Sequence, residues 1–130
     1  MSHRILVVED NLPNRELLCD WLGSEGFEVL SAADLGQAYA VFKGELPHAV
    51  LLDVQLGSED GLALAAWLRR QPALREIPII AVTAHAMVTD HERILQAGCN
   101  ACVSKPVDFR VLGVQLERWL NVAANLQPRP

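Results

Sequence analysis

The stretch Ala49-Val50-Leu51-Leu52-Asp53 decides the fold, because its apolar run ends directly on a carboxylate. A similar run, Ile5-Leu6-Val7-Val8, is followed at once by Glu9 and Asp10. Short apolar runs without polar alternation are typical of strands that are covered on both faces. The two runs therefore predict buried strands whose carboxyl ends carry acidic residues.

A third run, at residues 101–103, precedes Lys105 by one position. A charged group at the end of a buried strand is costly to place unless a partner lies near it. Three carboxylates and one ammonium group at equivalent points therefore predict a single site.

Outward from these runs, short apolar segments alternate with longer amphipathic ones. The patterns predict five strands, at residues 5–8, 28–31, 49–52, 79–82 and 101–104. They also predict five helices, around residues 17–22, 34–43, 64–71, 89–97 and 109–120. Asp34, Thr89 and Asp108 are the expected helix caps, with Thr89 and Glu92 forming a capping box.

This alternation is typical of an α/β fold: a parallel sheet with right-handed crossovers and helices on both faces, in a doubly wound (βα)5 arrangement. In such sheets the site lies beyond the carboxyl ends of the strands, where the strand order reverses. In the flavodoxin-like order 2-1-3-4-5, strands 1 and 3 flank that point. This order would bring Glu9, Asp10 and Asp53 together.

Length and composition narrow the function classes. The chain has 130 residues, 51% of them hydrophobic, which suits one domain, expected at residues 1–125, with a short tail at 126–130. The net charge of -5 without a basic run disfavours direct binding to nucleic acid. The N-terminal apolar run is too short for a signal peptide or a membrane span, so we expect a cytoplasmic protein that does not insert into membranes.

Cys99 and Cys102 have the C-x-x-C spacing that can mark a redox or zinc site. A second such pair is missing, and the pair leads into a strand-like run and not into a helix. We therefore interpret both as small core residues.

The acidic cluster requires a positive partner. Two carboxylates about 5 Å apart repel by roughly 3 kcal/mol at an effective dielectric constant of about 20. Mg²⁺ suits a few carboxylates that leave room for water and phosphate oxygens. The alternative, in which each acid only faces solvent, is reasonable for one acid but not for three acids with Lys105.

Two further strand ends offer groups that suit a phosphoryl oxygen. Thr83 and Ala84 follow the run at 79–82 and provide a hydroxyl and a backbone amide. Lys105 can neutralise another oxygen, and Pro106 fixes the turn that aims it. A nucleophile, a metal and such donors are what an in-line phosphoryl transfer needs.

Taken jointly, these residues resemble the receiver domains of two-component response regulators. The resemblance covers nearly the whole chain. It rests on four motifs: Val8-Glu9-Asp10-Asn11, Asp53 with Asp60-Gly61, residues 83–87, and Ala97-Gly98 followed by Lys105-Pro106.

The resemblance implies a signalling phosphoacceptor that catalyses only its own phosphorylation and dephosphorylation. Asp53 would accept the phosphoryl group from a histidine kinase or a histidine phosphotransfer protein. Asp10, Asp53 and the backbone carbonyl of Gln55 would bind Mg²⁺, with Glu9 acting directly or through water. The phosphoryl group would be held by the Thr83 hydroxyl, the Ala84 amide and the Lys105 amine, and the Lys105–Pro106 peptide would be cis.

The resemblance also implies an output face, the fourth helix, fifth strand and fifth helix within residues 88–120, which would bind a downstream protein or a second copy. Cys102 stands where the family usually has an aromatic switch residue, and Gly57 where many members have proline. Gln55 and His85 would tune the lifetime of the phosphoryl group.

Several alternatives stay open. The chain could be a stand-alone receiver, which its Met1 start slightly favours, or a receiver cut from a hybrid histidine kinase or multidomain regulator. A Mg²⁺-dependent aspartyl phosphatase would usually carry a second Asp where Gln55 stands, and it would turn over an external phosphomonoester. A phosphorylation-independent interaction module would fail to bind Mg²⁺.

Overall fold

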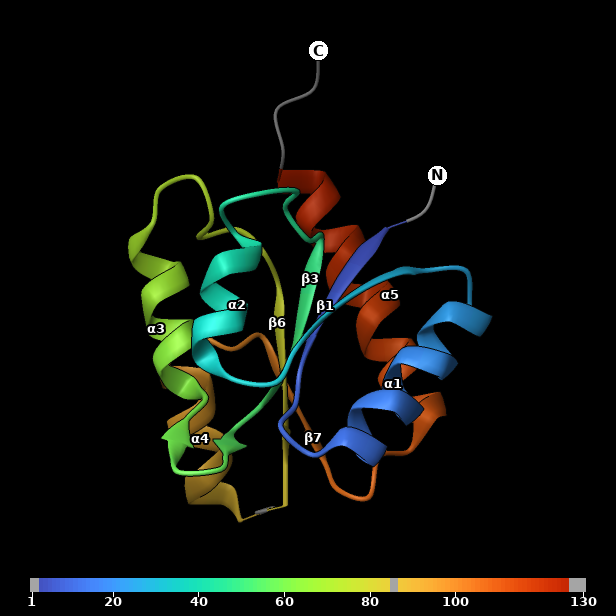
Figure 1. Cartoon of the computed structure of the whole chain (residues 1–130). Coiled ribbons are helices and arrows are strands. Elements are labelled where there is room, and N and C mark those ends of the chain that lie inside the picture. Colours follow the sequence, from blue (N-terminus) through green and yellow to red (C-terminus); the bar gives the residue numbers. More distant parts are fainter. Residues whose placement is uncertain (1–2, 85–86, 127–130) are drawn as a thin grey trace.

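The computed structural model describes residues 3–84 and 87–126, and within this part a central sheet lies between two layers of helices. Figure 1 shows α2, α3 and α4 on one face of the sheet and α1 and α5 on the other. The strands of this sheet are β1 (Arg4–Val8), β2 (Glu28–Ala32), β3 (Ala49–Asp53), β6 (Ile79–Thr83) and β7 (Ala101–Ser104). The helices are α1 (Leu12–Ser24), α2 (Leu35–Val41), α3 (Leu62–Arg70), α4 (Val88–Gln96) and α5 (Phe109–Leu126).

The strand order is β2-β1-β3-β6-β7, and each neighbouring pair is parallel. This arrangement confirms the predicted doubly wound fold and the order 2-1-3-4-5. The register places Val8 beside Leu52, Asp53 beside Val82, and Thr83 beside Ser104. Because the strands are parallel, their carboxyl ends meet at one edge of the sheet, which is where the predicted site residues lie.

The core consists of two layers, and the apolar strands contribute to both. Leu6, Val50 and Leu52 pack with buried residues of α2, α3 and α4. Ile5 and Leu51 point to the opposite face and pack with α1 and α5. Successive side chains of a strand point to opposite faces, so a strand buried on both faces needs an unbroken apolar run. This is why residues 49–52 are apolar without interruption.

Polar side chains cap three of the helices. Asn11 accepts a hydrogen bond from the Asn14 amide at the start of α1, at 3.0 Å. Asp34 accepts one from the Gln37 amide at 2.8 Å, which confirms the predicted cap of α2. At the start of α5, Asp108 accepts one from the Arg110 amide at 2.9 Å and is also the cap that the sequence predicts.

The predicted cap of α4 is wrong. This helix begins at Val88, so Thr89 lies inside its first turn, and Met87 at the cap position makes no side-chain capping bond. The Met87 carbonyl accepts hydrogen bonds from the Asp90 and His91 amides, at 3.0 and 3.1 Å. Because this turn begins before Thr89, its hydroxyl cannot cap the helix. The end of α2 also differs slightly, since α2 stops at Val41 and not near residue 43.

The predicted domain boundary at residue 125 falls one residue before the end of α5, and residues 127–130 lie outside the described part. Within the described ranges, the helices are too short or too polar to cross a membrane.

Candidate functional site

Glu9, Asp10 and Asp53 form an acidic cluster at the carboxyl ends of β1 and β3. Each contributes a carboxylate oxygen, and these oxygens lie within 4.8 Å of one another. Glu9 and Asp53 are 2% and 5% exposed, whereas Asp10 is exposed. β1 and β3 are adjacent in the sheet, so the residues that end them must lie side by side. The sequence prediction that these three acids meet is confirmed.

Glu9 lies in an unusual environment for a carboxyl group. Both of its carboxylate oxygens are buried, and neither accepts a hydrogen bond from the described residues. Burial, together with the adjacent Asp53 carboxyl, raises the pKa of Glu9 to about 7. A buried carboxyl group without hydrogen-bond donors, beside two further acids, fits a site that receives a cation.

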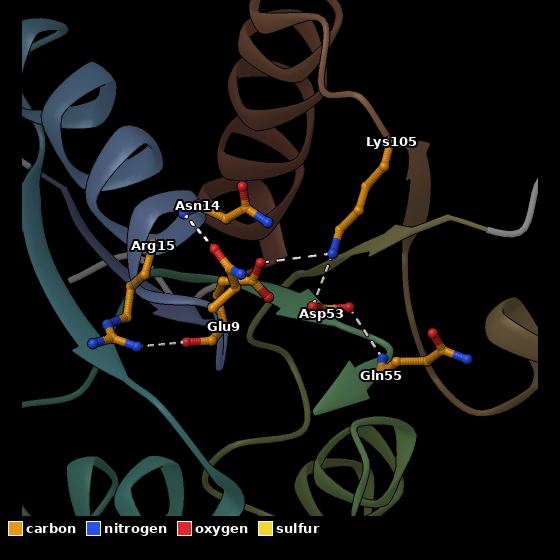
Figure 2. Close-up of polar contacts among 7 residues, drawn as sticks. Glu9, Asn14, Arg15, Asp53, Gln55 and Lys105 are labelled. Carbon is orange, nitrogen blue, oxygen red and sulfur yellow. Dashed lines mark hydrogen bonds and ion pairs between the residues drawn. The ribbon is translucent and has the colours of Figure 1, made fainter. Parts of the chain in front are cut away.

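Among the described residues, Lys105 places its ammonium group next to the carboxylates of this cluster. Its Nζ lies 3.0 Å from Oδ2 of Asp53 and 3.6 Å from Oε1 of Glu9. Figure 2 shows the Lys105 side chain reaching from the end of β7 toward both acids. Partial burial disfavours the charged form of Lys105, but its interactions with the Asp53 and Glu9 carboxyl groups outweigh this effect. The pKa of Lys105 is therefore raised. The following peptide bond, Lys105–Pro106, is cis, in agreement with the expectation.

Thr83 and Ala84 lie at the end of β6, on the same edge of the sheet. Thr83 is 2% exposed, and its carbonyl accepts the Lys105 amide at 2.8 Å. Ala84 follows it and is exposed. The backbone bond thus joins the last residue of β6 to the residue that directly follows β7. His85, the predicted tuning residue beyond Ala84, lies outside the described residues.

The connection after β3 forms a short hairpin that the sequence analysis did not predict. Its strands are β4 (Gln55–Leu56) and β5 (Glu59–Asp60), joined by Gly57 and Ser58. A two-residue Gly-Ser link is a known hairpin signal, and Gly57 has a positive φ of 60°. The Gln55 amide donates to Oδ1 of Asp53 at 3.0 Å, so the hairpin begins with a bond that holds this carboxylate.

Gly61 explains how the hairpin closes against β3. Its amide donates to the Val54 carbonyl at 2.7 Å. A side chain here would overlap the main-chain oxygen of Asp53, so only glycine allows this approach. The Asp60-Gly61 motif therefore has a structural reason, which is the close packing of the loop beneath Asp53.

Arg15 also contacts this region, through the backbone of Glu9, and the sequence did not predict this contact. Its Nη1 donates to the main-chain oxygen of Glu9 at 2.9 Å (Figure 2). No local pattern signals this contact, because the side chain reaches back from α1 across six positions.

A cavity of about 440 Å³ opens beside the acids. It lies between α1 and the connection from β7 to α5, and its walls include Leu17, Leu18, Val107 and Phe109. The acidic cluster is therefore accessible from an apolar groove, and not sealed in the core.

The two cysteines of the C-x-x-C motif pack as the structural interpretation predicts. Cys99 is buried, and burial raises the pKa of its thiol to about 12. Cys102 is partly buried in β7 and packs against the core on the α2–α4 face, and burial raises its pKa as well. Both are free thiols. A raised pKa lowers the thiolate fraction, which is unfavourable for redox or metal chemistry.

Comparisons with known proteins agree with this geometry. The family model described as the response regulator receiver domain matches residues 5–117. The polar-differentiation response regulator DivK of Brucella ovis is 39% identical over 107 residues, which cover 82% of this chain and 87% of DivK.

Solved structures give the same result. The receiver domain of the sensor histidine kinase PA1611 from Pseudomonas aeruginosa PAO1 is 36% identical, with a TM-score of 0.84. The match covers 93% of this chain and 99% of the PA1611 chain, and that structure has a magnesium ion in its active site cleft. A CheY-like receiver domain protein from Methanospirillum hungatei JF-1 is 27% identical with a TM-score of 0.87, over 98% of this chain and 100% of its own.

Proposed function

The chain belongs to the response regulator receiver domain family of two-component signalling, and on this premise we propose that Asp53 is its phosphoacceptor. The observation that carries the proposal is the environment of the Asp53 carboxylate. This group is buried at the end of β3. Its Oδ1 accepts a hydrogen bond from the Gln55 amide, and its Oδ2 lies 3.0 Å from Nζ of Lys105. It is held in place and accompanied by a positive charge, as an in-line nucleophile requires.

In the proposed reaction, a carboxylate oxygen of Asp53 attacks the phosphorus of a phosphohistidine. A bond from oxygen to phosphorus forms, the bond from nitrogen to phosphorus breaks, and the imidazole leaves with the electron pair. Lys105 neutralises charge on the phosphoryl oxygens. The Thr83 hydroxyl and the Ala84 amide, both at the end of β6, would donate to the other oxygens.

Asp10, Asp53 and the backbone carbonyl of Gln55 would hold Mg²⁺, with Glu9 as a direct or water-mediated partner. The ion, when bound, would neutralise charge shared between the carboxylates and the phosphoryl oxygens. The acids themselves provide the reason for this part of the proposal, since three carboxylates within 4.8 Å repel one another. The two buried oxygens of Glu9, which accept no hydrogen bond from the described residues, add a second reason.

The expected partners are a histidine kinase or histidine phosphotransfer protein as the phosphodonor, and a downstream protein or a second copy at the output face. This face comprises α4, β7 and α5, and it exposes large apolar side chains. Val88 and Leu95 of α4 are 73% and 49% exposed. The cytoplasmic location expected from the sequence is part of the same proposal.

Intact-protein mass spectrometry tests the acceptor. The chain is incubated with Mg²⁺ and acetyl phosphate, in parallel with Asp53→Asn and with Asp20→Asn, which replaces an exposed acid on α1. We expect one phosphoryl adduct on the native chain and on Asp20→Asn, and none on Asp53→Asn or in excess EDTA.

Absence of an adduct with every donor, a phosphohistidine protein included, would contradict the proposal. That result would favour a phosphorylation-independent interaction module.

A further inference from the structure

We propose that Arg15 is a positioning residue that fixes the connection from β1 to α1 and thereby holds Glu9 and Asp10 in the geometry that binds a divalent cation. The inference rests on the proposed function, since it assigns a role toward the proposed metal site. It begins from one contact, the hydrogen bond of 2.9 Å from Nη1 of Arg15 to the main-chain oxygen of Glu9.

With this contact, both the amide and the carbonyl of Glu9 are held by hydrogen bonds. The Glu9 amide donates to the Ala32 carbonyl of β2 at 3.0 Å, so one side of the residue is held by the sheet. Arg15 holds the other side through the carbonyl. That carbonyl and the amide of Asp10 belong to one peptide unit, which is planar. A bond to the oxygen therefore fixes the orientation of the unit that joins the two acids.

The acids need such support because they repel one another. Glu9 is confined by burial, but Asp10 is exposed, so surrounding side chains do not confine it in the same way. Rotation of the peptide between them would relieve repulsion by moving Asp10 outward. A charge-assisted bond to the peptide oxygen opposes this rotation.

The position of Arg15 suits this role and not direct contact with a ligand. Figure 2 shows Arg15 and Lys105 approaching from opposite sides, with Lys105 at the carboxylates and Arg15 at the backbone. The Arg15 side chain is half-buried, which strengthens its bond relative to one in open solvent. Groups that hold ligand residues from behind commonly tune metal affinity.

Arg4 offers a matched control, because it lies at the other end of β1 and also donates from its guanidinium to a main-chain oxygen. Its Nε lies 3.0 Å from the Leu46 carbonyl, and the side chain is likewise half-buried. Arg4 also forms ion pairs with Glu45 and Glu28, at 3.1 and 3.9 Å, so its removal gives an upper limit for the general cost of losing such a bond at a place remote from the acids.

The experiment measures Mg²⁺ affinity of the unphosphorylated full chain by calorimetry, for the native protein, Arg15→Ala, Arg15→Lys and Arg4→Ala. We expect Arg15→Ala to bind Mg²⁺ about tenfold more weakly or worse, as replacements behind a metal ligand usually do. Arg4→Ala should stay within about twofold of the native chain, since distant sites act independently. Arg15→Lys, which keeps the charge, should restore part of the lost affinity.

Amide hydrogen exchange in EDTA provides a second measurement that does not depend on the metal. Faster exchange of the amides at residues 9–12 in Arg15→Ala, without a change in β7, is the expected result. Unchanged exchange there would overturn the inference even if the affinity fell. If Arg15→Ala fails to fold, Arg15→Met, which removes the donors but keeps a long side chain, takes its place in the same comparison.

The outcomes separate this inference from the proposed function. If the native chain binds Mg²⁺ and Arg15→Ala binds it equally well, Arg15 has no positioning role, while the proposed function stands. Equal weakening by Arg15→Ala and Arg4→Ala would also overturn the inference, because a general loss of stability would explain it. If the native chain itself fails to bind Mg²⁺, the proposed metal site is wrong.

Discussion

His48 shows at the scale of a single residue how burial and a backbone contact favour one protonation state of a side chain. Its Nδ1 accepts the Arg4 amide at 2.8 Å, and its own amide donates to the Arg4 carbonyl at 2.7 Å. Only the neutral imidazole can accept at Nδ1. Burial, with the positive charge of Arg4 as a second cause, lowers the pKa of His48 below its usual 6.5.

This lowered pKa predicts a pH-dependent stability. The unfolded chain binds the proton more readily than the folded one, so protonation of His48 favours unfolding. Its stabilising contribution is complete above pH 6.5 and is lost as the pH falls below that value toward the lower pKa of the folded state. Urea denaturation at about pH 7.5 and about pH 5.5 should therefore show a larger loss for the native chain than for His48→Asn.

Asparagine is the informative replacement, because its side-chain oxygen can accept the Arg4 amide but does not titrate. Other groups, the carboxylates above all, contribute equally to the pH dependence of both proteins. Equal losses of stability in the two proteins would show that His48 does not titrate differently in the folded state.

At the scale of the secondary-structure elements, Arg69 joins three segments at the end of the sheet opposite the acids. From α3 it donates four hydrogen bonds of 2.8 to 2.9 Å. The acceptors are the carbonyls of Gly98, Arg75 and Ile77 and the side-chain oxygen of Asn100. The same Asn100 oxygen accepts the amide of Ile79, the first residue of β6.

The turn from α4 to β7 is shaped around this side chain. Gly98 has a positive φ of 116°, and a Cβ there would lie 2.7 Å from Cγ of Arg69. Glycine is therefore required both by the backbone conformation and by the close approach of Arg69. The Ala97-Gly98 motif of the sequence has its physical explanation in this contact.

We predict that Arg69→Ala lowers the free energy of unfolding by about 2–4 kcal/mol, because it removes four hydrogen bonds and takes the Arg69 donor from the partly buried Gly98 and Ile77 carbonyls. Arg69→Lys should lose less than Arg69→Ala but should not match the native chain, since an ammonium group cannot reproduce the planar fork. Urea denaturation measures both.

Arg70→Ala is the control for that experiment, because Arg70 is the next residue of α3 and is exposed. It should change the free energy of unfolding by no more than about 0.5 kcal/mol. A similar loss in Arg69→Ala and Arg70→Ala would mean that the hydrogen bonds of Arg69 contribute little.

At the scale of the whole molecule, the strand order makes the site asymmetric. The three acids, Thr83 and Lys105 lie at the ends of β1, β3, β6 and β7, whereas none of them comes from β2 at the far edge. Thr83 and Lys105, which are proposed to contact the phosphoryl group, lie at the ends of the two strands nearest the output face.

We therefore expect phosphorylation to change the dynamics of one side of the molecule. A phosphoryl group adds roughly -1.5 to -2 charges, which Thr83 and Lys105 must accommodate. Amide hydrogen exchange with and without acetyl phosphate should change in α4, β7 and the start of α5, and little in β2 and α2. Asp53→Asn, treated identically, should show no change in any of these elements.

A change of equal size in β2 and α2 would contradict this asymmetry. The experiment also examines Cys102, which lies in β7 where the family usually has an aromatic residue. A clear response in β7 would mean that the transition does not need an aromatic ring at this position.

The sequence by itself determined the α/β alternation and the placement of Glu9, Asp10 and Asp53 at strand ends, whereas the order 2-1-3-4-5, on which their meeting depends, was a hypothesis that the strand pairing confirms. These features follow from burial, because a strand covered on both faces must be apolar and its end is where charges can begin. The helix caps Asp34 and Asp108 were predictable for the same kind of reason, since a cap acts on amides within its own turn.

Only the tertiary structure decided the contacts that cross between distant segments. Arg15 reaches the Glu9 carbonyl, Arg69 joins α3 to the turn before β7, and the raised pKa of Glu9 depends on how deeply the fold buries it. The start of α4 was wrongly predicted from Thr89, because the first turn of that helix is already closed by hydrogen bonds to the Met87 carbonyl. Hydrophobic periodicity records which residues are buried, but it does not record which distant polar groups meet, and that depends on the packing of the complete fold.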